Sequence, residues 1–183
     1  MTIAEETIMQ HLNSLLSQSE PGAILHHMHV VSAPPDAIGP LGLPAQDQLH
    51  TDIYALAPEG QVDVDEFVSK VMFKAHADAT KEGHRILFVA LAQEMWFVHS
   101  QALDEHAKEL LEQGRLQEHP AAQEVTVLYA ACRDGRRWYG RHVLTGPQAG
   151  EKLNVELLVG RPSPREALGI AGARLVRGLV GLQ

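Results

Sequence analysis

Hydrophobic residues near the start of the chain recur at helical spacing. Ile8, Leu12 and Leu15 would share one side of a helix, and glutamates occupy its first turn, where the helix dipole favours negative charge. The pattern predicts a helix over Ile3–Ser17, which Pro21-Gly22 ends.

Three further helices are predicted downstream. Asp63 and Glu66 form a capping-box-like pair at the start of a long apolar stripe that Gly83 closes. A short helix is expected over Asp104–Gln113. The run Ser163-Pro164-Arg165-Glu166 combines a serine cap, a proline at the first helical position and a following glutamate, so a C-terminal helix is expected to about Val180.

Between these helices, short apolar or alternating runs bounded by glycine and proline are typical of strands. A loop rich in glycine and proline separates the first two runs. Asp134-Gly135 lies between two others and predicts a hairpin. The expected strands are Ala23–Ser32, Leu49–Leu56, Arg85–Val98, Val125–Cys132, Arg136–Leu144 and Lys152–Val159.

The strand Arg85–Val98 is apolar on both of its faces. A strand of this kind is usually central in a sheet and covered on two sides. Simple alternation places Ile86, Phe88, Ala90 and Trp96 on one face and Leu87, Val89, Leu91, Met95 and Phe97 on the other.

The helices and strands do not alternate regularly, as a doubly wound parallel fold would require. We therefore predict a single α+β domain over residues 1–183, with an antiparallel β-sheet, helices packed on it, and a helix near each terminus. The last helix has a wide apolar stripe, and the strand Arg85–Val98 is apolar on both faces. Burying these surfaces needs more packing partners than one chain of this length is expected to provide, which favours a homo-oligomer.

Composition narrows the class of protein. The apolar fraction of 45% is ordinary for a globular chain, no apolar run is long enough to cross a bilayer, and the N-terminus lacks the order of a signal peptide. The single cysteine, Cys132, forms no internal disulfide and excludes a multi-cysteine zinc site. A reducing, cytoplasmic setting is expected.

The net charge of −8 is unevenly distributed, with −12 over residues 1–120 and +4 over residues 121–183. In one interpretation the two regions pack together and neutralise each other. In the other, the arginines of the second region form a contact surface for an acidic partner.

Four side chains form a candidate metal site. His27 and His29 are two positions apart on one predicted strand, and His50 and Asp52 repeat the spacing on the next. If these strands pair, imidazoles and a carboxylate could converge on zinc or a similar divalent metal. The alternative is that all four are half-exposed strand residues and no cofactor is bound.

Two other residues invite a chemical interpretation. Glu94 interrupts the most apolar strand, so it is either a desolvated general acid or a side chain that faces water at the sheet margin. Cys132 adjoins Arg133, whose charge would lower the thiol pKa, but no Cys-His signature accompanies it, so we favour a semi-buried structural cysteine. No serine-nucleophile or nucleotide-binding motif is present.

The hairpin around Asp134-Gly135 is the most distinctive candidate surface. Arginines interleaved with aromatic rings can stack on bases or anchor a protein interface, whereas a buried ring would make the hairpin structural. Alternation places Arg136, Trp138 and His142 on one face. The candidate partner-binding residues are Arg133, Arg136, Arg137, Trp138, Tyr139 and Arg141.

One family resemblance adds to this picture. The order Trp96, Glu118-His119-Pro120, Glu124, an apolar strand and Asp134-Gly135-Arg136 resembles small uncharacterised proteins encoded by bacteria and their phages. It covers roughly residues 85–145 and has no established activity, so it implies no site residue. A phage-encoded protein would be virion-associated.

We therefore expect a non-enzymatic accessory or structural protein that acts through protein–protein contacts, without catalytic residues. The first alternative is a metal-dependent hydrolase that uses the histidine and aspartate site. The second is nucleic-acid binding by the basic C-terminal third, against which the acidic remainder counts.

Overall fold

The computed structural model describes residues 3–21, 26–39, 42, 48–56, 64–146, 149 and 154–157. Within this part of the chain, helices and strands follow one another in nearly the predicted order. They are α1 (Glu5–Ser17), β1 (His26–Ala33), β2 (His50–Leu56), α2 (Val64–Glu82), β3 (Arg85–Val98), α3 (Glu105–Glu112), β4 (Ala122–Cys132), β5 (Arg137–Val143) and β6 (Asn154–Leu157), with short 3₁₀ turns at Ser100–Ala102 and Leu116–Glu118.

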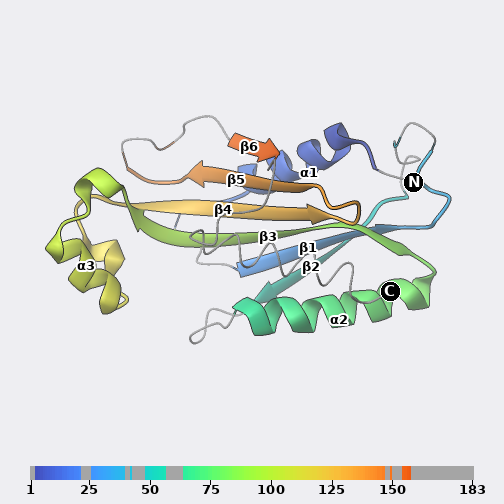
Figure 1. Ribbon diagram of the computed structural model, residues 1–183, viewed down its shortest axis with the longest axis horizontal. Coiled ribbons are helices and arrows are strands. Elements are labelled where there is room, and N and C mark those ends of the chain that lie inside the picture. The colour runs from blue at the N-terminus through green and yellow to red at the C-terminus, as the bar shows by residue number, and fades with distance from the viewer. Residues whose placement is uncertain are drawn as a thin grey trace.

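The strands form one antiparallel sheet in the order β2-β1-β3-β4-β5-β6. Figure 1 shows α1 and α2 on opposite sides of this sheet and α3 beyond its end. The predicted α+β class and N-terminal helix are confirmed. The expected C-terminal helix from Ser163 and the Asp63 cap lie outside the described residues.

The first core lies between α1 and the sheet. Leu12 and Leu16 of α1 pack on side chains of the central strands, among them Phe88, and on Trp138 of β5. Trp138 is fully buried, with an exposed fraction of 0%. The apolar stripe that predicted α1 is therefore the stripe that covers this face.

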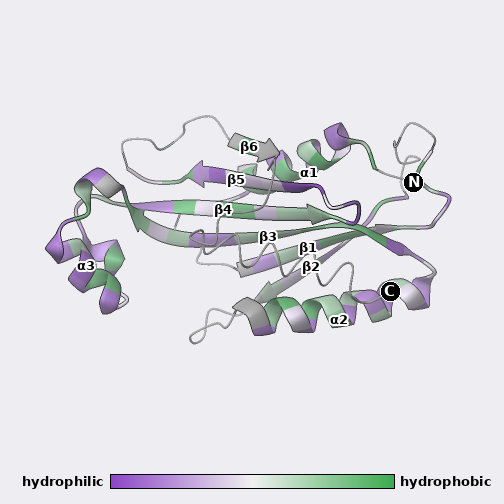
Figure 2. Ribbon diagram, in the orientation of Figure 1, coloured by the Kyte–Doolittle hydropathy of each residue, from purple (hydrophilic) through white to green (hydrophobic). Residues whose placement is uncertain are grey.

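The second core lies on the opposite face, where α2 covers β1, β2 and β3. Phe67, Val71 and Met72 of α2 pack on Met28 of β1 and Tyr129 of β4. Figure 2 shows hydrophobic residues along α2 and through the central strands, interrupted in β3 by a polar segment. The central strand is thus covered twice, as its sequence predicted.

A β-bulge early in β3 changes which residues face each core. Val31 of β1 pairs with Phe88 and Ser32 pairs with Ile86, so Leu87 is the extra residue. Ile86 consequently joins the α2 core, and Leu87 packs on the α1 side. The faces assigned to these two residues by simple alternation were wrong, because the bulge shifts the alternation by one position.

The segment between β3 and β4 forms a small lobe around α3. Asp104 caps the helix, because its Oδ1 accepts a hydrogen bond from Ala107 N at 2.8 Å. Nδ1 of the buried His119 accepts from Ala121 N at 3.1 Å, and its Nε2 lies 3.3 Å from Asp104 Oδ1. The cap bond and the neighbouring His119 lower the pKa of Asp104. None of the described helices is long and apolar enough to cross a membrane.

The burial of Trp138 predicts a large cost for its removal. Trp138→Ala should lower the free energy of unfolding by about 3–5 kcal/mol, because it leaves a cavity under α1. Leu111→Ala is the matched control, since that side chain of α3 is 58% exposed, and it should change stability by less than about 0.5 kcal/mol. Urea unfolding measures both. Equal effects would contradict the placement of Trp138 in the core.

Candidate functional site

The strand register separates the four predicted metal ligands into two pairs. His29 of β1 pairs with Ile53 of β2, so His27 and His29 lie on the α1 face. His50 and Asp52 pair with Ser32 and Val30 and lie on the α2 face. The predicted four-ligand site therefore does not form. Within the described residues, no group of three or more histidine, cysteine, aspartate or glutamate side chains has a geometry that could hold a metal ion.

His27 and His29 instead line a pocket at the C-terminal end of α1. The pocket has a volume of about 340 Å³, and strands β1 and β2 provide much of its wall. We call it the α1-end pocket. Its lining residues are Leu15, Gln18, Ser19, Glu20, His27, His29, Ile53, Ala55 and Glu94.

His29 is held in this wall as a neutral imidazole. Its side chain lies against two other imidazoles, with ring centroids 5.7 Å from His11 and 5.3 Å from His27. Burial, and then the neighbouring His27 and His11, lower the pKa of His29 to about 4. The Nδ1 atom of His29 has no hydrogen-bond partner in the described structure.

Glu94 contributes a carboxylate to the same pocket. It pairs with the buried Thr126 of β4 and is only 4% exposed, so it does not face water at a sheet margin. Its neighbour Gln93 is the last residue of β3 that pairs with described β1. Glu94 therefore lies just beyond the described pairing of β3 with β1 and lines the pocket together with the C-terminal residues of α1.

The end of α1 is fixed over the sheet by a histidine on β5. Nδ1 of His142 lies 3.0 Å from the carbonyl oxygen of Leu16, to which it can donate a hydrogen bond. A helix C-terminus carries partial negative charge, and the Leu16 carbonyl accepts this bond in addition to one from Ser19 N at 3.3 Å. Gln18, Ser19 and Glu20 follow directly and form the rim of the α1-end pocket.

His50 and Asp52 form a separate polar group on the α2 face of the edge strand. Nε2 of His50 lies 3.1 Å from Oδ1 of Asp52, and both side chains are more than a third exposed. The His50 ring contacts His84, which in turn lies 3.4 Å from the Ser32 hydroxyl. This arrangement is an exposed hydrogen-bonded pair with its neighbours, and exposed polar pairs of this kind contribute little to stability.

The arginine-rich hairpin is largely structural near its turn. Its loop ends in Gly135, which has a φ of +92°. Arg136 donates to the carbonyl of Ile3 at 2.6 Å, forms an ion pair with Asp134 at 2.8 Å, and stacks over the buried Trp138 ring at 5.4 Å. Arg136 therefore ties the segment before α1 to the hairpin, and Trp138 is not available to a partner.

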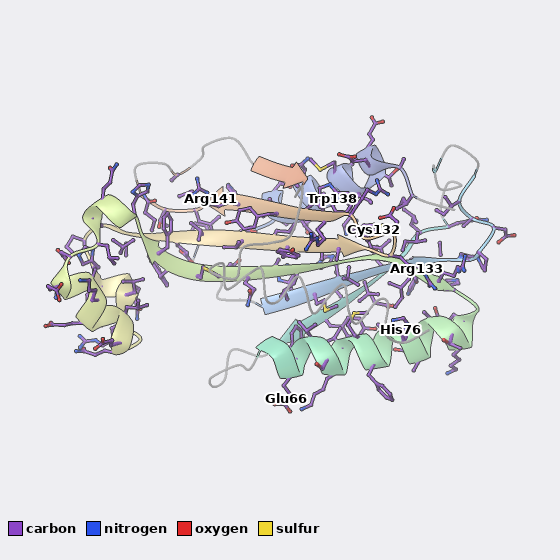
Figure 3. All side chains as sticks on the ribbon, in the orientation of Figure 1. Glu66, His76, Cys132, Arg133, Trp138 and Arg141 are labelled. Carbon is purple, nitrogen blue, oxygen red and sulfur yellow. The ribbon has the colours of Figure 1, made fainter. Side chains whose placement is uncertain are left out.

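The remaining hairpin residues are spread along β5. Arg133 and Arg141 are exposed, but Figure 3 places Arg133 at the turn and Arg141 toward the other end of the strand. Arg137 and Tyr139 are half-buried on the α2 side of the sheet. The described arginines and aromatic rings consequently do not form one continuous surface.

Cys132 is a buried structural residue. Its Sγ donates to the carbonyl of Leu87 at 3.2 Å, and its side chain packs in the core under α1. Burial raises the pKa of the thiol to about 11, so the nearby arginines do not make it a thiolate at neutral pH.

Two features at the α1-end pocket were missed from the sequence. His11 does not line the pocket but contacts His29 in its wall, and its spacing from Ile8 and Leu15 could have placed it on the inner face of α1. Gln18, Ser19 and Glu20 gave no signal, because their role depends on how α1 ends over the sheet. Comparisons of the chain with protein-family models, curated proteins and solved structures found no match.

Arg136 and Arg141 offer a matched pair of substitutions. Arg136→Ala should lower the free energy of unfolding by about 1–2 kcal/mol, because it removes the side-chain donor to the Ile3 carbonyl and to Asp134 Oδ2. Arg141→Ala removes an exposed arginine from β5 of the same hairpin and should cost less than about 0.5 kcal/mol. Chemical denaturation compares them. A neutral Arg136→Ala would show that the tie to Ile3 contributes nothing.

The low pKa of His29 predicts a pH-dependent stability. The unfolded imidazole takes up a proton near pH 6.5, but the folded one does so only near pH 4, so stability falls as the pH drops through this window. The wild-type protein should lose up to about 1 kcal/mol per pH unit more than His29→Gln. His99→Gln, at an exposed histidine, is the control. Parallel wild-type and His29→Gln profiles would rule out a neutral buried His29.

Proposed function

We propose that the protein is a non-enzymatic accessory or structural protein that works through protein–protein contacts, and that its first contact is with a second copy of itself through the edge strand β2. The observation that carries the proposal is an exposed isoleucine on a strand that has only one neighbouring strand within the described part of the chain. β2 ends the sheet order, and Ile53 at its centre is 63% exposed.

The edge formed by β2 carries one charged residue, Asp52, but lacks most of the features that usually keep such edges monomeric. Natural edge strands are commonly short or carry lysine, proline or a bulge. β2 is seven residues long, contains no lysine, arginine or proline, and pairs with β1 without a register shift. The opposite edge of the described sheet is β6, of which four residues are described. A strand edge such as that of β2, which pairs on one side only within the described residues, is a template for strand addition.

The sequence of β2 suits antiparallel pairing with itself. If two copies align about Ile53, the two isoleucines lie opposite each other, with Cβ atoms about 4.5–5.5 Å apart. Asp52 then faces Tyr54, and Thr51 faces Ala55, so no like charges oppose each other across these pairs. The contact would extend the sheet continuously through both copies.

Exposed apolar surface on the neighbouring helix supports the same contact. Phe73, at 72%, is the most exposed large apolar side chain of the described structure, and Ile53 is second. Phe73 belongs to α2, which packs on β2, and Lys74 of α2 lies over the Tyr54 ring at 5.5 Å. α2 would therefore lie close to the seam between two copies.

The other two functions receive less support. A hydrolase that uses His27, His29, His50 and Asp52 would need them on one face of the sheet, which the register prevents. Nucleic-acid binding by the basic C-terminal third stays a prediction, because half of its arginines lie outside the described residues. In the described hairpin it has little support, because the Trp138 ring is buried. A role for Arg133, Arg137, Tyr139 and Arg141 in binding an acidic partner stays a prediction.

Self-association through β2 is tested by mass in solution. Light scattering should give twice the 20.1 kDa chain mass for the wild-type protein. Ile53→Lys should give a monomer, because a charge at the seam would be desolvated and would face its own copy. Leu111→Lys, which changes a 58% exposed leucine of α3 in the same way, should remain dimeric. A monomeric wild-type protein, or a dimeric Ile53→Lys, would contradict the proposal.

A further inference from the structure

We propose that the α1-end pocket binds a small alkylammonium ligand, whose charged head lies against Glu94 and whose aliphatic chain lies against Leu15, Ile53 and Ala55. The residues that line this site belong to one chain, and Ile53 is shared with the proposed β2 seam, so the ligand would bind beside that seam.

The charge of the pocket favours a cation. Two carboxylates line it, the deeply buried Glu94 and the exposed Glu20 on its rim, and no lysine or arginine is among the described residues that line it. A carboxylate in a partly dry pocket interacts strongly with an opposite charge that reaches it. The acidic balance of −12 over residues 1–120 would attract the same sign of ligand.

The end of α1 adds to this preference. Leu15, Gln18 and Ser19 bring the C-terminus of a 13-residue helix to the pocket wall. Helix C-termini carry partial negative charge and interact favourably with cations. An anion placed here would face both the helix end and Glu94.

His29 supplies a polar wall without positive charge. A neutral imidazole has one nitrogen that accepts a hydrogen bond and one that donates, and burial keeps His29 neutral well below pH 7. His29 is 7% exposed and lines the pocket, and its Nδ1 lacks a partner in the described structure. An ammonium group has three donors, which suits carboxylate and imidazole acceptors together.

The size and apolar residues of the pocket distinguish an alkylammonium ion from a bare metal ion. A volume of about 340 Å³ is far larger than an ion needs, and the described residues hold no three-ligand metal group. Leu15, Ile53 and Ala55 present aliphatic surface that a hydrocarbon chain of a few carbons can cover.

The test uses three probes with the same four-carbon chain, namely n-butylammonium chloride, sodium butyrate and n-butanol. At pH 7.5 and constant ionic strength, n-butylammonium should raise the melting temperature by a few degrees and should titrate to a single site per chain in calorimetry. Butyrate and butanol should not do so. Equal stabilisation by butyrate or butanol, or none by n-butylammonium, would overturn the proposal.

A pair of charge-neutralising variants locates the site. Glu94→Gln keeps the shape of the side chain and should weaken n-butylammonium binding at least tenfold, because it removes the buried carboxylate. Glu112→Gln makes the same change at an exposed position of α3 and should leave the affinity unchanged. If Glu94→Gln does not fold, Glu20→Gln at the rim should still weaken binding about two- to threefold. Unchanged affinity in the folded Glu94 or Glu20 variant would overturn the assignment.

Discussion

The structure depends on the antiparallel pairing of β3 with β4 and on the burial of this pair from both sides. Side chains of β3 alternate between the core under α1, through Phe88, and the core under α2, through Val89. Hydrophobic burial on each face stabilises the sheet only if a helix covers it. Because α1 covers the central strands toward β5 and α2 covers the side toward β2, the α1 face of β1 and β2 keeps the α1-end pocket and the exposed Ile53.

Much of the fold could be predicted from local patterns. The stripe of α1, the two-faced strand at Arg85–Val98 and the Asp134-Gly135 turn are short-range signals, and each appears in the structure near its predicted bounds. The bulge at Leu87 could not be predicted, because it arises from how β1 and β3 pair rather than from the sequence of β3 alone. It exchanged the expected faces of Ile86 and Leu87.

The candidate site depended more heavily on long-range pairing. His27 and His29 share a face because they are two apart in one strand, and this could be predicted. Whether His50 joins them depends on the register of β2, and a shift of one residue exchanges the faces of a whole strand. The role of the hairpin also depends on long-range contacts that its own sequence does not reveal. Its composition suggested a binding surface, but the packing of α1 on Trp138 and the bond from Arg136 to Ile3 make the part near its turn structural.

Disulfide cross-linking at Ile53 tests self-association through β2 most directly, because it reports both the strand and its register. If two copies pair about this residue, Ile53→Cys places two thiols opposite each other, at a separation that a disulfide can span. The native Cys132 is buried and its thiol pKa is about 11, so it should not react. Mild oxidation should link Ile53→Cys into a covalent dimer and leave Leu111→Cys on α3 unlinked. A monomeric Ile53→Cys, or equal linking at Leu111, would contradict pairing through β2.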